Sequence, residues 1–184
     1  IFDLGERLEA GANMPGMIDM REASVAALQK RFGVDLAQAG RVEALAQHLH
    51  RQLVARAPRE LQRELSWAAA LHEIGMMVSH HDHHRHSAYL LAHVDAAGFS
   101  QNQLKRLGDL ALGQRGGLRK LEAQMSDETL LWQLLALRLA VIACHARGEV
   151  DAKALSLSLS QGSKGRKLQL SLPASWAAEQ PRTL

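Results

Sequence analysis

The chain has 184 residues, of which 47% are hydrophobic, 22% charged and only 4% aromatic. This composition excludes an intrinsically disordered chain and favours helices that pack through aliphatic side chains. The formal net charge is +3 with ten histidines counted as neutral, a balance that fits an anionic partner as well as ordinary solubility. No run of 18 apolar residues is present, so no membrane-spanning helix is predicted, and the single cysteine, Cys144, suits a cytoplasmic protein.

The first part of the chain predicts a linker followed by three helices. Residues 1–18 include Gly-Ala-Asn-Met-Pro-Gly, which is typical of a linker. Asp19 and Asp35 are expected to cap the first two helices, because aspartate accepts hydrogen bonds from the free amides of a first helical turn. Pro58 precedes a third helix, which is expected to end near Gly75.

The middle of the chain predicts further helices, interrupted by a histidine-rich segment and a glycine-rich segment. Residues 79–86 are expected to form a loop, and a capping-box pattern at Ser100 opens a later helix. Glycines near residue 116 break that helix. Ser126 is then expected to open the longest helix, which runs to about Arg147.

After residue 148 the hydrophobic pattern changes from helical to alternating. Leucines alternate with polar residues over 155–159 and 168–172, with a turn-like segment, 161–166, between them. This pattern is typical of a β-hairpin with one buried face, which must pack on the helices or on strands from outside the chain. We therefore expect a mainly α fold in three parts: a linker (1–18), a helical domain (19–148) and a β-hairpin appendage (149–184).

Histidines are concentrated in one part of the sequence, where they fill five of the seven positions 80–86. Imidazole is a common ligand for zinc and other transition metals, so this cluster is compatible with a metal site. The candidate ligands would be His72, Glu73, His80 and His81. The alternative is a hydrophilic loop without a metal, with His72 on the buried face of a helix and Glu73 beside it in a structural role.

Two segments resemble a known family. Residues 67–75, Trp-Ala-Ala-Ala-Leu-His-Glu-Ile-Gly, and 84–91, His-Arg-His-Ser-Ala-Tyr-Leu-Leu, closely resemble the carboxy-terminal region of the exopolyphosphatase/guanosine pentaphosphatase family. Arg41-Val42, before these segments, and residues 137–140 and 172–176, after them, fall in the expected order. That region is similar to the HD superfamily of metal-dependent phosphohydrolases. The resemblance therefore implies an HD-like helical bundle.

The resemblance also implies that the metal ligands of the HD superfamily are absent. In those enzymes a His, a His-Asp pair and a distant Asp bind the metal. The corresponding positions here are Gln38, His72-Glu73 and Val141. An amide binds divalent ions more weakly than imidazole, and valine offers no lone pair. The family resemblance therefore implies a fold kept without metal chemistry, with no catalytic residue or cofactor of its own.

Family resemblance further implies an actin-like catalytic half before this chain, which uses Mg²⁺ to hydrolyse terminal phosphoanhydrides. The helical half is expected to contribute dimer contacts and part of a groove for inorganic polyphosphate or guanosine pentaphosphate. Binding such a polyanion needs spaced cations, and the candidates are Arg85, His86, Arg115, Arg119 and Lys120. Two alternatives remain: a self-sufficient HD-type phosphohydrolase and an anion-binding interaction domain. Few aromatic residues and no recognisable motif argue against specific nucleic-acid binding.

Overall fold

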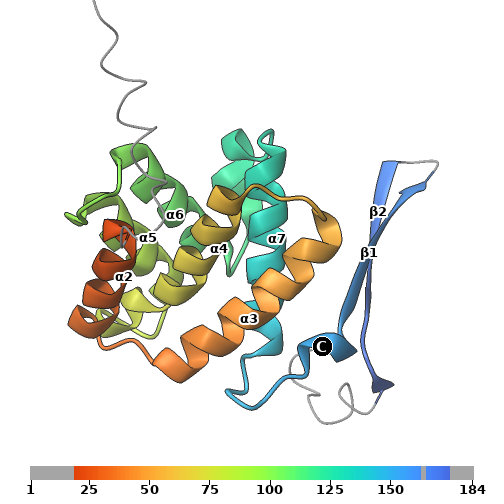
Figure 1. Ribbon diagram of the computed structural model, residues 1–184, viewed down its shortest axis with the longest axis horizontal. Coiled ribbons are helices and arrows are strands. Elements are labelled where there is room, and N and C mark those ends of the chain that lie inside the picture. The colour runs from red at the N-terminus through yellow and green to blue at the C-terminus, as the bar shows by residue number, and fades with distance from the viewer. Residues whose placement is uncertain (1–18, 163–164, 175–184) are drawn as a thin grey trace, which may run out of the picture.

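The computed structural model describes residues 19–162 and 165–174 as a bundle of helices with a two-stranded sheet beside it (Figure 1). In chain order the elements are α2 (Met20–Arg31), α3 (Leu36–Leu53), α4 (Arg59–Leu71), η2 (Ile74–Met77), α5 (His83–His93), α6 (Gln101–Gly113), η3 (Leu118–Gln124), α7 (Glu128–Ala143), η4 (Ala152–Ala154), β1 (Ser156–Gly162) and β2 (Gly165–Ser171), where η marks a 3₁₀ helix. The predicted mainly α fold with a carboxy-terminal hairpin is confirmed. The expected linker, residues 1–18, lies outside the described residues.

Short polar side chains cap the helices where the sequence predicted them. The carboxylates of Asp19 and Asp35 each accept a hydrogen bond of 3.0 Å from a main-chain amide in the first turn of their helices. Ser100 and Gln103 form the reciprocal capping box at the start of α6. Each such cap contributes about 1 kcal/mol to helix stability.

Helix α7 differs from its expected bounds at both ends. Asp127, rather than Ser126, caps it, because the Asp127 carboxylate accepts from two main-chain amides of the first turn. The helix ends at Ala143 instead of near Arg147, and its 16 residues make it shorter than α3 with 18. Arg147 takes a left-handed backbone conformation with φ of 57°, which is incompatible with a continuing α-helix.

The core lies among α3, α4, α6 and α7, which pack against one another. Its fully buried side chains are mostly leucines, among them Leu45, Leu49, Leu65, Leu71, Leu107, Leu110, Leu134 and Leu137. Burial of each such leucine stabilises the fold by about 1.5–3 kcal/mol relative to exposure. Within the described part of the chain, no helix is both long and apolar enough to cross a membrane.

The turn that follows α4 packs directly on the start of α5. A Cβ atom at Gly75 would lie 2.2 Å from the carbonyl oxygen of His83 and 2.4 Å from the amide nitrogen of Ser87. The Ser87 hydroxyl accepts from the Gly75 amide and donates to the His72 carbonyl, both at 2.9 Å. The Gln114 side-chain amide donates to the same carbonyl at 2.7 Å. The turn is thereby tied to α5 and to the end of α6.

The histidine-rich segment is not wholly a loop, contrary to the prediction. Asp82 takes a left-handed conformation with φ of 54°, and α5 begins at the next residue, His83. His83, His84 and Ser87 are buried on the inner side of this helix. The polar composition indicated a loop, whereas residues of this segment are buried in a helix that Ser87 ties to the turn after α4.

The hairpin packs on the bundle through its base. β1 and β2 pair antiparallel beside α3 (Figure 1). Leu155 and Leu157 are buried, and the Leu157 amide donates to the side-chain oxygen of Gln52 on α3. Leu159, farther along β1, is 40% exposed, so only part of the predicted leucine face is covered. The strands extend into the expected turn 161–166, since β1 ends at Gly162 and β2 begins at Gly165.

Replacing Gly75 with alanine should destabilise the protein, because the new methyl group has no space against the α5 backbone. Overpacking of this kind typically costs about 1–3 kcal/mol. The matched control is Gly40→Ala within α3, where a Cβ would meet nothing within 4 Å. Alanine is the better helix former, so this control should raise the free energy of unfolding by about 0.5–1 kcal/mol. Urea unfolding measures both, and equal effects would contradict the close contact.

Candidate functional site

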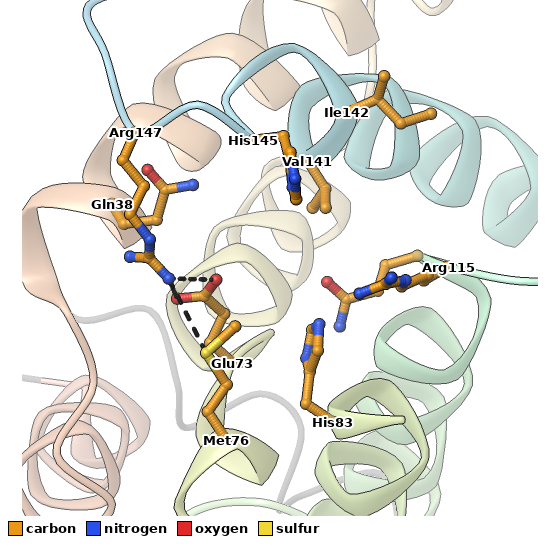
Figure 2. A pocket seen from close by; sticks show the side chains of 10 residues that line it. Gln38, Glu73, Met76, His83, Arg115, Val141, Ile142, His145 and Arg147 are labelled. Carbon is orange, nitrogen blue, oxygen red and sulfur yellow. Dashed lines mark hydrogen bonds and ion pairs between the residues drawn. The ribbon is translucent and has the colours of Figure 1, made fainter. Parts of the chain in front are cut away.

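A cavity of about 300 Å³ opens where the ends of several helices meet (Figure 2). Its lining residues come from the start of α3, the turn after α4, the start of α5, the end of α6, and the end of α7 with the residues after it. They are Gln38, Glu73, Met76, His83, Gln114, Arg115, Val141, Ile142, His145 and Arg147. The cavity therefore brings together residues that lie far apart in the sequence, from Gln38 to Arg147.

The positions that correspond to the HD metal ligands meet at this cavity. Gln38, Glu73 and Val141 all line it, although they belong to three separate elements of the chain. His72, the remaining position, adjoins Glu73 and is only 1% exposed. The fold thus places three of the four positions on one cavity wall and the fourth beside it.

Gln38 uses its whole side-chain amide in structural hydrogen bonds. Its nitrogen donates to the carbonyl of Cys144 at 2.9 Å. Its oxygen accepts from Nε and Nη2 of Arg41, at 3.2 and 3.0 Å. Since a carbonyl oxygen has two lone pairs, both are taken by Arg41. Gln38 thus joins α3 to the end of α7 and offers no vacant electron pair to a metal ion.

Glu73 is paired with a guanidinium. Nη2 of Arg147 lies 3.0 Å from Oε1 of Glu73, and Nη1 lies 2.7 Å from Oδ2 of Asp35. The Glu73 side chain is only 10% exposed, and a carboxylate with so little access to water needs a partner. Arg147 therefore provides the positive charge that a bound cation would otherwise provide.

His72 is buried and held by the main chain. Its Nδ1 lies 2.6 Å from the Ala69 carbonyl, to which it donates, whereas Nε2 lies 3.8 Å from Glu73. The Ala69 carbonyl, rather than Glu73, therefore orients the ring. Burial lowers the pKa of His72 to about 4, so the ring is neutral at pH 7.

The cavity does not fit a divalent metal ion. Val141 has no donor atom, and Gln38 and Glu73 already have partners. The other candidate ligands differ in burial: His72 is buried, whereas His80 and His81 of the histidine-rich segment are exposed. Among the residues the structure describes, no three His, Cys, Asp or Glu side chains are grouped so that they could hold a metal ion.

The predicted polyanion-binding residues lie on two neighbouring segments. They are Arg85 and His86 on α5, and Arg115, Arg119 and Lys120 between α6 and η3 or within η3. Lys120 Nζ donates to the Arg115 carbonyl at 2.9 Å. The pKa of Lys120 is lowered, first by burial and then by the charges of Arg85 and Arg138. Arg85, Arg115 and Lys120 are thus brought together, while Arg119 is exposed on the same 3₁₀ helix.

Comparisons with known proteins identify the family of the chain. The family model described as Ppx/GppA phosphatase, domain III, matches residues 20–184. The chain belongs to this family. A guanosine-5'-triphosphate,3'-diphosphate pyrophosphatase of Photobacterium profundum is 32% identical over 95% of this chain and 37% of its own length. A protein of the same name from Vibrio cholerae is 34% identical over 90% of this chain and 33% of its own length. Another, from Pseudoalteromonas translucida, is 33% identical over 70% of this chain and 27% of its own length. The domain III chain spans about a third of the length of these relatives.

Several cavity residues were not predicted from the sequence of this domain III chain. Gln114, His145 and Arg147 carry no motif, and Arg138, which contributes to the charge around Lys120, was not singled out either. For Gln114, the only sequence signal was its position next to Arg115, which was predicted to bind the polyanion. Arg147 reaches a partner 112 residues away in sequence, which no local pattern reveals.

The buried His72 should make stability depend on pH. Its folded-state pKa of about 4 lies below the ordinary value of 6.5, so between these values the unfolded chain binds a proton that the folded chain does not. The free energy of unfolding contributed by His72 is therefore complete above pH 6.5. It declines as the pH falls from 6.5 to 4, by roughly 3 kcal/mol at most.

The measurement is urea unfolding at pH 7.5 and pH 4.5 for the wild type and for His72→Gln. Glutamine cannot take up the proton, so the variant should lose less stability on acidification than the wild type. At pH 7.5 the variant should itself be less stable by about 1–3 kcal/mol, because a buried hydrogen-bonding group is altered. If both proteins lost the same free energy of unfolding between pH 7.5 and pH 4.5, His72 would not be a buried neutral histidine.

Proposed function

We propose that this chain is a non-catalytic module of a larger phosphoanhydride hydrolase that acts on inorganic polyphosphate or guanosine pentaphosphate. Support comes from its membership of the Ppx/GppA phosphatase family and from relatives named as pyrophosphatases, about three times its length. In this proposal the hydrolytic centre and its Mg²⁺ belong to amino-terminal, actin-like domains. The module contributes contacts in a homodimer and a surface for the polyanion.

The observation that carries the proposed surface is the cluster of cations around the loop between α6 and η3. Gly116 has φ of 74°, and a Cβ there would lie 3.5 Å from Lys120 Nζ and 3.6 Å from His84 Nε2. Repulsion from Arg85 and Arg138 adds to burial in lowering the pKa of Lys120. A phosphate chain bound here would relieve this repulsion, since anions stabilise the charged form of lysine.

The 184-residue chain alone should release no phosphate from polyphosphate with Mg²⁺ or Mn²⁺. The reason is that the cavity at the HD-like positions offers an occupied amide, a paired carboxylate and a valine in place of metal ligands. Phosphate release is measured colorimetrically after removal of trace hydrolases. Hydrolysis that disappears in His72→Ala would instead establish the chain as a phosphohydrolase.

In the full-length protein, neutralising the four predicted surface cations should weaken the binding of long polyphosphate selectively. The variant is Arg85→Gln, Arg115→Gln, Arg119→Gln and Lys120→Gln together. A long polymer continues over this surface, whereas a very short one is held at the catalytic half alone. Each charge-assisted contact contributes about 1.5–3 kcal/mol at best and less where salt screens it. We expect a Michaelis constant for long chains at least 10-fold higher, with hydrolysis of short chains little changed.

The matched control replaces four exposed cations on other elements, Lys30, Arg51, Arg56 and Lys153, with glutamine. This variant has the same change in net charge and should leave the chain-length preference unaltered. Equal losses on long and short substrates, or the same effect from the control set, would contradict a dedicated polyanion surface at α5 and η3.

A further inference from the structure

The wall of the cavity holds a cation that the fold does not pair. Arg115 lines the cavity from an exposed position, and its main-chain carbonyl accepts a hydrogen bond from Lys120. Its guanidinium has no hydrogen-bond or ion-pair partner among the residues that the structure describes. A guanidinium presents several donors in one plane, a geometry that matches the oxygens of a phosphate or carboxylate.

Two buried polar groups of the same wall are also unpaired. His83 is 5% exposed and Gln114 is 1% exposed, and both line the cavity. The Gln114 nitrogen is fixed on the His72 carbonyl, which leaves the side-chain oxygen without a donor. Nδ1 of His83 likewise has no partner among the described residues. Buried polar groups are rarely left unpaired, so a ligand with its own donor would complete this wall.

The rest of the cavity suits an uncharged group attached to an anion. Val141 and Ile142 of α7 lie across from His83 and Arg115, and Met76 borders the cavity below Glu73 (Figure 2). The one carboxylate of the lining, Glu73, is already paired with Arg147, so it does not dominate the charge that an entering anion meets. The volume of about 300 Å³ lies at the lower end of the range for small-molecule sites.

We propose that this cavity binds a small phosphomonoester, with its phosphate on Arg115 and its apolar or aromatic group against Val141 and Ile142. A phosphomonoester fits better than a carboxylate because a singly protonated phosphate both accepts from Arg115 and donates to the Gln114 oxygen. In this singly protonated form the phosphate carries one negative charge, which the Arg115 guanidinium balances. The site is separate from the polyanion surface proposed above, although Arg115 borders both.

The test is a titration of the ¹⁵N-labelled chain by NMR with three probes: phenyl phosphate, inorganic phosphate and phenol. Phenyl phosphate should perturb the amides of Gln114, Arg115 and His145 in a saturable manner. Inorganic phosphate should bind at least 10-fold more weakly, and phenol should not saturate. Inorganic phosphate binding as tightly as the ester, or perturbations confined to η3, would overturn the proposal.

Three variants locate the site. Arg115→Gln should weaken the binding of phenyl phosphate roughly 10-fold to 100-fold, the effect of losing a charge-assisted hydrogen bond. Val141→Phe should abolish binding by filling the cavity while leaving every surface cation in place. Arg119→Gln, which neutralises an exposed arginine on the same segment, should change nothing.

Melting curves verify that each variant folds. Val141→Phe also separates this proposal from the polyanion surface, because it should leave the handling of long polyphosphate by the full-length protein intact. Unchanged ester binding in folded Val141→Phe, or equal losses in the Arg115 and Arg119 variants, would overturn the cavity as the site.

Discussion

The arrangement of the cavity depends on one close contact, between the turn that follows α4 and the first turns of α5. The contact requires glycine at position 75, because a side chain there would overlap the α5 backbone. It is stabilised by the Ser87 hydroxyl, which accepts a hydrogen bond from the Gly75 amide and donates one to the His72 carbonyl. Gln114 joins the same carbonyl from α6. Glu73, His83 and Gln114 therefore keep fixed positions around the cavity, although they belong to different elements.

Around that contact, the positions that the HD resemblance assigned to metal ligands are occupied by side chains bound to arginines or by an apolar residue. Where a metal site would need donor atoms with free electron pairs, the chain has an amide bound by Arg41 and a carboxylate bound by Arg147. Both arginines are partly open to solvent but direct their guanidiniums onto these two groups. The ends of α3 and α7 are joined through Gln38, so residues at ligand positions now contribute to the cohesion of the bundle.

Local signals made much of the fold predictable. Asp19 and Ser100 cap helices as expected, because capping depends on residues within one turn. Asp127 was missed beside Ser126, since both residue types can cap and only the geometry decides between them. The start of α5 was missed for another reason: Asp82, which precedes it, makes no side-chain capping bond, so no local cap marks where the helix begins.

The candidate site was less accessible to sequence reasoning. Gln38, Glu73 and Val141 could be placed together only through the family resemblance, since they share no spacing. Arg115 was selected as a surface cation, and the structure shows that it also borders the cavity. The pairing of Arg147 with Asp35 and Glu73 could not be predicted, because it joins residues far apart in sequence through a left-handed backbone position.

The ion pair between Arg147 and Glu73 also restricts the ways in which this cavity could acquire a metal site. Introducing histidine at position 38 and aspartate at position 141 would supply ligands, but the Arg147 guanidinium would remain bound to Glu73 and would repel an entering dication. Removing Arg147 first would leave Glu73 almost buried without a counter-charge, which lowers stability. The charge of Arg147 thus opposes a metal ion while its removal destabilises the fold, so the ion pair acts against any stepwise construction of a metal site in this cavity.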